Sequence, residues 1–96
     1  MINKENTPYD ETPYLSYPYN QTSPEKLATL GKLFGMNPPK LETAKVLELG
    51  CAAGGNIIPH AVHYPKGHFV GVDLSKVQVD EGNKFIKSMG LKNVEL

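Results

Sequence analysis

The chain has 96 residues, enough for one small domain with a modest core and too few for a second domain of ordinary size. Ten Lys and Arg residues balance ten Asp and Glu residues, so no net field would gather nucleic acid or anionic lipid. No apolar run approaches the ~18 residues of a membrane span, and the N-terminus has no apolar signal core. Because the single cysteine also excludes an internal disulfide, we expect a cytoplasmic protein without a membrane partner.

Residues 1–22 are expected to form an irregular arm. They are rich in Pro, Tyr, Asn and Thr, and their apolar residues follow neither a helical nor a strand period. Four tyrosines fall within a short span, at Tyr9, Tyr14, Tyr17 and Tyr19. Two interpretations are open: a mobile tail, or a segment whose aromatic rings close over a pocket, since tyrosine combines a large contact area with a polar tip.

The pattern changes at residues 23–40, where a helix and a linker are expected. Ser23 can cap a helix and Pro24 suits its first position. Apolar residues then recur at helical spacing as far as Phe34, and the glycine that follows offers a left-handed exit. The Asn-Pro-Pro run at 37–39 ends the helix and leads into an extended linker.

Strands and helices alternate beyond residue 40. The elements expected in chain order are a strand at 45–49, a helix at 56–63, a strand at 68–73, a helix from 75 to Gly90, and a strand starting at 93. Neither of the first two strands alternates with polar residues, so both are expected to be buried on both faces. Pro59 should lie in the first turn of its helix or kink it. The second of these helices should bury a stripe of Val79, Gly82, Ile86 and Met89.

This order predicts an α/β fold, the N-terminal half of a Rossmann-like doubly wound parallel sheet. Short connections between parallel strands imply right-handed crossovers. Ligands of such sheets bind beyond the carboxyl ends of the strands. In this sequence those ends are 48–50 and 72–74.

The stretch VLELGCAAGGN, residues 46–56, predicts a ligand site at the first strand end. Gly50 and Gly54 would allow the backbone to approach a ligand closely. Asp73 follows Gly50 by 23 residues, close to the ~20 at which a carboxylate accepts hydrogen bonds from a ribose diol, so a nucleoside is the minimum inference. Glu48 would oppose a pyrophosphate but suits a cationic amino group and sulfonium, as in S-adenosylmethionine. The G-x-G-x-x-G pattern of dinucleotide sites is also broken, because Ala52 occupies its second glycine position.

The same stretch, followed by FVGVDLS at 69–75, resembles the first two motifs of class I S-adenosylmethionine-dependent methyltransferases. The resemblance implies that Glu48, Gly50 and Gly54 wrap the methionine part of the cofactor and that Asp73 holds its ribose. Ala52 departs from the family's glycine pattern. We therefore expect a small adjustment of the loop or a weakened affinity for the cofactor.

The leader at 9–39 and GGNIIPHA at 54–61 resemble a narrower group, bacterial methyltransferases with a downstream regulatory domain. This group includes lysine methyltransferases that act on outer-membrane proteins, so the resemblance implies a protein lysine as methyl acceptor. It also implies that the arm covers the cofactor pocket through Tyr9 and Tyr14. The complete cofactor-binding set implied is Glu48, Gly50, Cys51, Ala52, Gly54, Asn56, Asp73, Leu74, Tyr9 and Tyr14.

By this comparison residues 41–96 form an incomplete methyltransferase domain, and no catalytic residue can be assigned. In the family a fourth strand lies beside the first. Without it, the strand at 45–49 is an exposed apolar edge, so we expect the isolated chain to be marginally stable, to self-associate or to pair with a completing chain.

Simpler interpretations accompany each candidate residue. Glu48 could bond to nearby backbone, and Asp73 could cap the next helix. Cys51 is expected to be a small packing residue, and His60 with His63 lacks the further ligands of a metal site. Two other functions remain open: a non-catalytic truncated remnant or interaction module, and a fragment of a nicotinamide- or flavin-dependent oxidoreductase.

Overall fold

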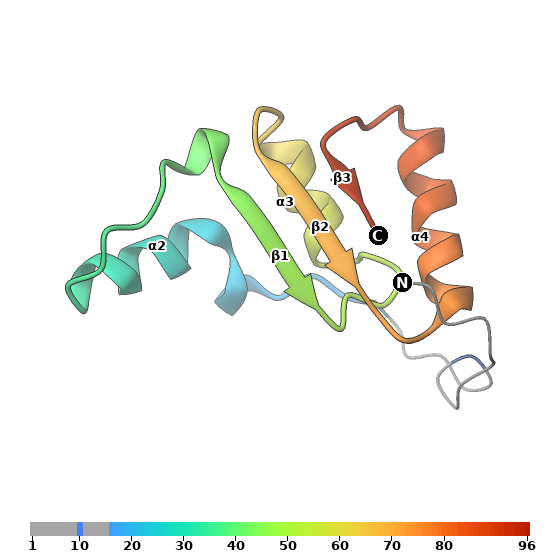
Figure 1. Cartoon of the computed structure of the whole chain (residues 1–96), viewed down its shortest axis with the longest axis horizontal. Coiled ribbons are helices and arrows are strands. Elements are labelled where there is room, and N and C mark those ends of the chain that lie inside the picture. The colour runs from blue at the N-terminus through green and yellow to red at the C-terminus, as the bar shows by residue number, and fades with distance from the viewer. Residues whose placement is uncertain (1–9, 11–15) are drawn as a thin grey trace.

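The three strands in the described part of the chain form one parallel sheet in the order β1-β2-β3 (Figure 1). The structure is a computed structural model that describes residue 10 and residues 16–96. Its elements are η1 (Asn20–Thr22), α2 (Pro24–Leu33), η2 (Leu41–Thr43), β1 (Lys45–Leu49), α3 (Ile57–His63), β2 (His68–Val72), α4 (Lys76–Ser88) and β3 (Val94–Glu95). This architecture confirms the prediction of half a Rossmann-like α/β sheet.

Local sequence explains where the helices begin and end. Pro24 is the first residue of α2, and Gly35 follows the helix with a φ of +84°. Ser23 stands at the cap position, but its side chain makes no capping hydrogen bond. Ser75 does cap α4, because its hydroxyl accepts a hydrogen bond from the backbone N–H of Gln78 at 3.3 Å. Pro59 lies in the first turn of α3, where the N–H that proline lacks has no partner within the helix.

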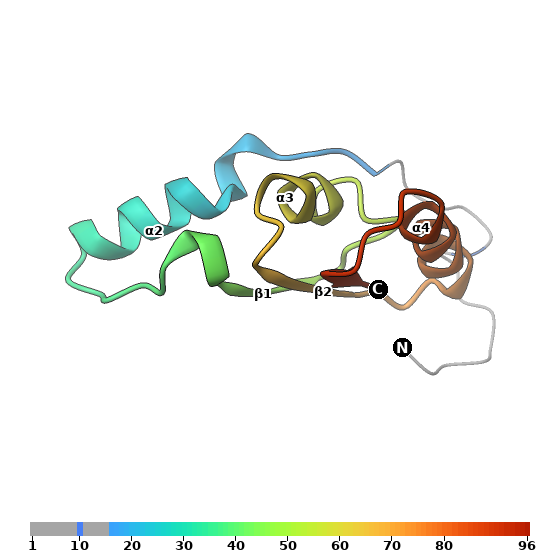
Figure 2. The ribbon, with the colours of Figure 1, turned by 90° about the horizontal axis from the view of Figure 1, so that it is seen from above.

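The core lies between the sheet and the two helices α3 and α4. Both crossovers run in one direction along the sheet, so both helices cover the same face (Figures 1 and 2). The buried cluster consists of Ile57, Ile58, Ala61, Phe69, Ile86 and Val94. Val79 and Gly82 of the predicted α4 stripe are also buried, whereas Met89 is 49% exposed because it lies just beyond the helix end.

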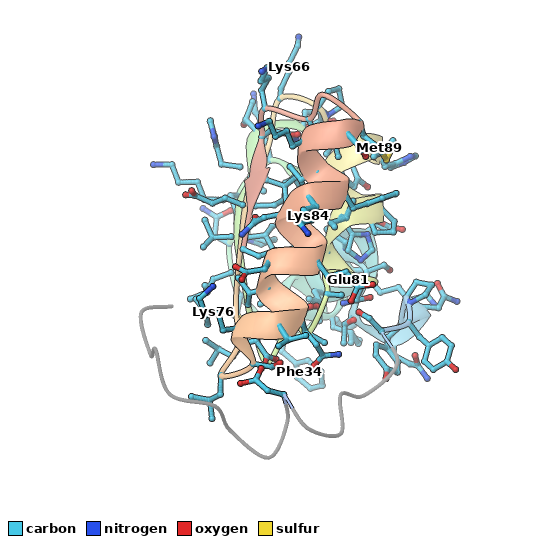
Figure 3. All side chains as sticks on the ribbon, turned by 90° about the vertical axis from the view of Figure 1, so that its right-hand side faces the viewer. Phe34, Lys66, Lys76, Glu81, Lys84 and Met89 are labelled. Atoms are coloured by element: carbon cyan, nitrogen blue, oxygen red, sulfur yellow. The ribbon has the colours of Figure 1, made fainter. Side chains whose placement is uncertain are left out.

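The outer face of α4 carries several charged side chains (Figure 3). Glu81 and Lys84 lie on the side of the helix that faces away from the sheet. Lys76 forms an ion pair with Asp80 one turn further on, with both side chains more than half exposed. Pairs of this kind stabilise a helix by only about 0.3–0.5 kcal/mol. None of the helices in the described part of the chain is long and apolar enough to cross a membrane.

The prediction that β1 and β2 are buried on both faces is wrong for this chain. Leu47, Leu49 and Val70 are 62%, 76% and 37% exposed. The described helices cover one face of the sheet, and none of them lies on the opposite face (Figure 2). Continuous apolar strands are typical of sheets covered on both faces. These strands therefore carry side chains suited to a cover that the described residues do not supply.

The predicted exposed edge is present at β1, which is the outer strand of the sheet. Helix α2 lies beyond this edge, and its main contacts are with the short helices η1 and η2 (Figure 2). Its apolar stripe is largely open, since Leu27, Leu30 and Phe34 are 53%, 49% and 80% exposed. The part of the molecule around α2 and the β1 edge is therefore much less packed than the part around α3 and α4.

Candidate functional site

The loop at 50–55 joins β1 to α3 and is anchored on the end of β2. The backbone N–H groups of Gly50 and Cys51 donate to the carbonyl oxygen of Val72 at 2.8 and 3.0 Å. Gly50 has a φ of +72°, and a Cβ built there would meet nothing within 4 Å. The backbone at Gly50 therefore faces open space, which is the geometry that the predicted close approach of a ligand requires.

Asp73 ties this loop to the start of α4. One carboxylate oxygen, Oδ2, accepts from the backbone N–H of Ala52 at 2.9 Å, and Oδ1 accepts from that of Ser75 at 2.9 Å. The simpler interpretation of Asp73 as a helix-entry residue is thus partly realised. Each carboxylate oxygen has a second lone pair, so Asp73 can still accept from a ligand hydroxyl.

Ala52, the residue that departs from the family's glycine pattern, keeps a glycine-like backbone. Its φ is +52°, and it is the one described residue other than glycine with a positive φ. Such a conformation costs an L-residue roughly 1–2 kcal/mol. The loop therefore accommodates alanine through local strain, with its N–H held by Asp73.

Gly54 serves packing rather than ligand approach. A Cβ at this position would lie 2.6 Å from Cδ1 of Ile58 and 3.1 Å from Cδ1 of Leu96, and the φ is +86°. The space beside Gly54 is therefore filled by the core. The expectation that Gly54 offers open backbone to a ligand does not match this geometry, because close packing of loop, helix and strand accounts for the glycine.

Glu48 and Asn56 form a direct pair beneath the loop. Glu48 is half-buried near the end of β1, and Asn56 is buried at the N-cap position of α3. Nδ2 of Asn56 donates to Oε2 of Glu48. Glu48 thus bonds to a side chain and not, as the simpler interpretation had it, to nearby backbone. That side chain belongs to the predicted set of cofactor-binding residues.

Cys51 behaves as a packing residue. Its side chain is buried over β2, where a Cβ on Gly71 would come within 2.7 Å of Sγ. Burial is the main cause that raises the pKa of the thiol to about 11, and the nearby carboxylates of Asp73 and Glu48 contribute to the same rise. Cys51 therefore stays protonated near neutral pH and is unsuited to nucleophilic chemistry.

Of the arm residues predicted to cover the pocket, Tyr9 and Tyr14 lie outside the described residues. Two other arm residues contact the site. Oγ of Ser16 accepts from the backbone N–H of Gly55 at 2.7 Å, and the N–H of Tyr19 donates to Oδ1 of Asn56 at 2.7 Å. The described arm, from residue 16 onward, is thus attached to the loop.

Asp10 makes a further contact at the start of α4. Its Oδ1 accepts from the hydroxyl of Ser75 at 2.6 Å and from the backbone N–H of Val77 at 3.0 Å. Neither Asp10 nor Ser16 was among the residues predicted from the sequence. Gly55 was the available sequence signal for the Ser16 contact, because a second consecutive glycine indicates that another backbone segment comes close. In the structure a Cβ on Gly55 would lie 2.4 Å from the carbonyl oxygen of Ser16.

The strand ends open into a groove of about 1050 Å³ that continues along the β1 edge to α2. Its walls include Gly50, Ala52, Asp73 and Leu74 at the strand ends and Leu27 on α2. Within the described residues no three His, Cys, Asp or Glu side chains are grouped to hold a metal ion. The groove therefore joins the predicted ligand site to the least packed part of the molecule.

Comparison with known families identifies the class of protein. The family model described as a methyltransferase domain matches residues 40–96. The chain therefore belongs to the methyltransferase-domain family, which confirms the resemblance drawn from residues 46–56 and 69–75.

Among curated proteins, RP789 of Rickettsia prowazekii (strain Madrid E) is 65% identical over 91 residues, covering 95% of this chain and 16% of that protein. RP028 of the same organism is 50% identical over 97 residues, covering 100% of this chain and 39% of that protein. The chain thus spans well under half the length of these relatives.

Among solved structures, PKMT2 from Rickettsia typhi in complex with AdoHcy (S-adenosylhomocysteine) matches with a TM-score of 0.80 and 51% identity, covering 88% of this chain and 16% of that one. Coclaurine N-methyltransferase, bound to N-methylheliamine and SAH, matches with a TM-score of 0.53 and 21% identity over 82% of this chain and 24% of that one, and shows the fold alone. AdoHcy is the demethylated product of S-adenosylmethionine, so the PKMT2 complex agrees with the cofactor predicted for the family.

Proposed function

We propose that this chain forms the S-adenosylmethionine-binding part of a methyltransferase. The observation that carries the proposal is the open backbone of Gly50 between two strand ends that bear the carboxylates of Glu48 and Asp73. The cofactor carries an ammonium group, a sulfonium and a ribose diol. Two carboxylates and a bare backbone surface fit these groups, so the residues present suit this ligand.

Each residue has a distinct proposed role. Glu48 would bind the ammonium group, and Asp73 would accept hydrogen bonds from the ribose hydroxyls while it keeps its bonds to Ala52 and Ser75. Gly50 would lie against the ligand, where a side chain would interfere. When bound, the cofactor supplies a transferable methyl group on its sulfonium.

The dinucleotide alternative is disfavoured by the same geometry. Glu48 is bonded to Asn56 at the start of α3, the place where a dinucleotide fold puts its pyrophosphate. A carboxylate there repels phosphate oxygens. A nicotinamide or flavin dinucleotide would therefore meet a like charge where it needs hydrogen-bond donors.

Calorimetric titration of the 96-residue chain with S-adenosylhomocysteine tests the proposal, with NAD as the control ligand. We expect saturable one-site binding of S-adenosylhomocysteine and none of NAD. A folded chain, judged by circular dichroism, that binds NAD or neither ligand would contradict the proposed function.

We further propose a protein lysine as the methyl acceptor of the complete protein. The support is the resemblance of the leader and of residues 54–61, together with 51% identity to PKMT2. A lysine amine must lose its proton before it can accept a methyl group. A chain extended by the remainder of RP789 should therefore methylate lysine in a protein substrate faster at higher pH. Mass spectrometry showing methyl groups only on other residues would contradict this proposal.

The open edge of β1 is proposed to pair with a strand of a second copy when no completing segment is present. The backbone N–H of His68 donates to the carbonyl oxygen of Ala44, and the backbone N–H of Gly50 donates to that of Val72. Residues of even number in β1 therefore face β2, and the N–H and C=O groups of Lys45, Leu47 and Leu49 point toward the open edge. Such an edge is a template for strand pairing.

A further inference from the structure

Asn56 is the meeting point of three segments of the chain. Its side chain is buried, with 7% exposed. Oδ1 accepts from the backbone N–H of Tyr19 at 2.7 Å, while Nδ2 donates to Oγ1 of Thr22 at 3.2 Å and to the carboxylate of Glu48. An amide can do this because it carries an acceptor and two donors. Aspartate offers no donor when ionised, and serine offers only one.

The arm side of this network lies directly on the loop. In Figure 2 the arm passes over α3 on the side away from the sheet. Ser16 accepts from Gly55 at 2.7 Å, and any side chain on Gly55 would collide with the Ser16 backbone. The arm is thus held by its own backbone and hydroxyl groups at residues 16, 19 and 22, independently of the tyrosine rings.

The other side of the network reaches the proposed cofactor site. The bond from Asn56 occupies Oε2 of Glu48. Within the described residues no hydrogen bond to Oε1 is present, so this oxygen is left for a ligand. The orientation of Oε1 is fixed by the bond that Asn56 makes to its partner oxygen.

We propose that Asn56 is a positioning residue that aims the Glu48 carboxylate at the cofactor and couples it to the arm at 16–22. This inference rests on the proposed function. Because both segments share one buried amide, a ligand that orders Glu48 also favours the attached arm, and an attached arm favours the ligand by the same factor.

Asn56→Asp tests the coupling, because it keeps the acceptor for Tyr19 and removes the donor to Glu48. In the variant two neighbouring carboxylates repel each other. One of them therefore takes up a proton at a higher pH than an isolated carboxylate, and the pair then shares it. At about pH 8 we expect the variant to bind S-adenosylhomocysteine about 10-fold or more weakly than the wild type, since a bond to a charged group is lost. At about pH 5.5 the shared proton restores the bond, and the affinity should return to within about threefold of the wild type.

Asn93→Asp is the matched control. Asn93 donates to the carbonyl oxygens of Ala61 and Tyr64, away from the strand ends, and among the described residues its side chain makes no hydrogen bond to a carboxylate. The ionisable groups that line the groove around Glu48 are Tyr17, Tyr19, Lys45, Cys51, His60 and Asp73. Histidine can change charge in this pH range. The wild type and both variants share these groove groups, and each variant adds one carboxyl, so the pH dependence that Asn56→Asp shows beyond that of Asn93→Asp reports the coupling.

Limited chymotrypsin cleavage gives a second readout on the wild type. Tyr17 and Tyr19 are 54% and 55% exposed and offer cleavage sites within the arm. We expect saturating S-adenosylhomocysteine to slow this cleavage at least threefold in the wild type and to lose that effect in Asn56→Asp at about pH 8.

The outcomes separate this inference from the proposed function. Wild-type binding without arm protection, or an Asn56→Asp variant whose relative affinity is the same at both pH values, overturns the role of Asn56 and leaves the proposed function standing. A folded wild type that does not bind S-adenosylhomocysteine overturns both.

Discussion

The α3 and α4 side of the sheet and the β1 edge with α2 differ sharply in how completely this chain packs them. A Cβ on Gly71 or Gly82 of the first region would come within 3 Å of neighbouring atoms. In the second region a Cβ on Gly31 would meet only ordinary contacts at 3.7–3.8 Å, and one on Gly35 would meet nothing within 4 Å. The first region is therefore closely packed, whereas the second presents apolar side chains that the described residues leave exposed.

The proposed cofactor site lies mainly in the closely packed region, on the α3 and α4 side of the sheet. Hydrogen bonds hold Gly50 to the end of β2, Asn56 to the arm, and Asp73 to the loop and to the residue that caps α4. The β1 edge and α2 contribute the far end of the groove. We therefore expect cofactor binding to depend on the hydrogen bonds around the loop at 50–55. Self-association should depend instead on the open edge of β1.

The largest expected effect is that of Asp73→Asn on ligand binding. Replacing a charged acceptor by an amide should weaken binding of S-adenosylhomocysteine by about 1.5–3 kcal/mol. Asp80→Asn is the control, since Asp80 lies in an exposed ion pair on α4 and should leave the affinity unchanged. Calorimetry on folded variants measures both. Equal affinities of Asp73→Asn and the wild type would remove Asp73 from the site.

A pair of glycine substitutions tests the difference in packing directly. Alanine normally favours a helix interior over glycine by about 0.5–1 kcal/mol. At Gly82 of α4 the new Cβ would lie 2.3 Å from Cδ1 of Leu96 and 2.6 Å from the carbonyl oxygen of Ala53, so Gly82→Ala should destabilise the fold by about 1–3 kcal/mol. Gly31→Ala in α2 should instead stabilise it by about 0.5–1 kcal/mol. Urea unfolding gives both signs, and a stabilising Gly82→Ala would show that this region is loosely packed.

Leu47→Pro is aimed at the open edge. The N–H of Leu47 points away from β2, so proline there should leave the β1–β2 ladder intact and block pairing with a second copy. We expect self-association to weaken about tenfold, roughly 1.4 kcal/mol, since ladder bonds and edge contacts are lost. Val46→Pro removes an N–H that faces β2 and should unfold the chain. Light scattering that shows the same association for Leu47→Pro as for the wild type would place the contact elsewhere.

The smallest expected effect concerns strain in the loop. Ala52→Gly relieves a left-handed alanine but adds freedom to the unfolded chain, so the free energy of unfolding should rise by less than about 1 kcal/mol. Ala53→Gly, at a neighbouring residue without a positive φ, should lower it by about 0.5–1 kcal/mol. Thermal unfolding compares the two, and a lower stability for Ala52→Gly would mean that the alanine side chain contributes packing that outweighs its strain.

Local sequence signals predicted the elements well. β1 has the predicted bounds of Lys45–Leu49, and β2 and α2 differ from prediction by one residue at the C-terminal end. These elements are defined by short patterns of apolar residues, proline and glycine, which act over a few residues. The charge argument from Glu48 and Asp73 also required only their places at strand ends.

The long-range contacts could not be predicted in this way. Ser16 and Tyr19 bond to residues 39 and 37 positions further along the chain, and such pairs leave no local pattern. The prediction of strands buried on both faces failed for a related reason. An apolar run such as that around Leu47 indicates a strand suited to a sheet that is covered on both faces. The described residues cover only one of these faces.

Residue-resolved amide hydrogen exchange, with and without S-adenosylhomocysteine, tests the central contrast most directly. At a concentration where the chain is monomeric by light scattering, the amides of Leu47 and Leu49 should exchange fast with or without ligand. The ligand should slow exchange at Ala52, whose N–H holds the loop to Asp73, and at Gly55 and Tyr19, whose N–H groups hold the arm to the loop and to Asn56. Protection of Leu47 and Leu49 in the monomer, or saturating ligand that slows none of the other three, would contradict this division of the molecule.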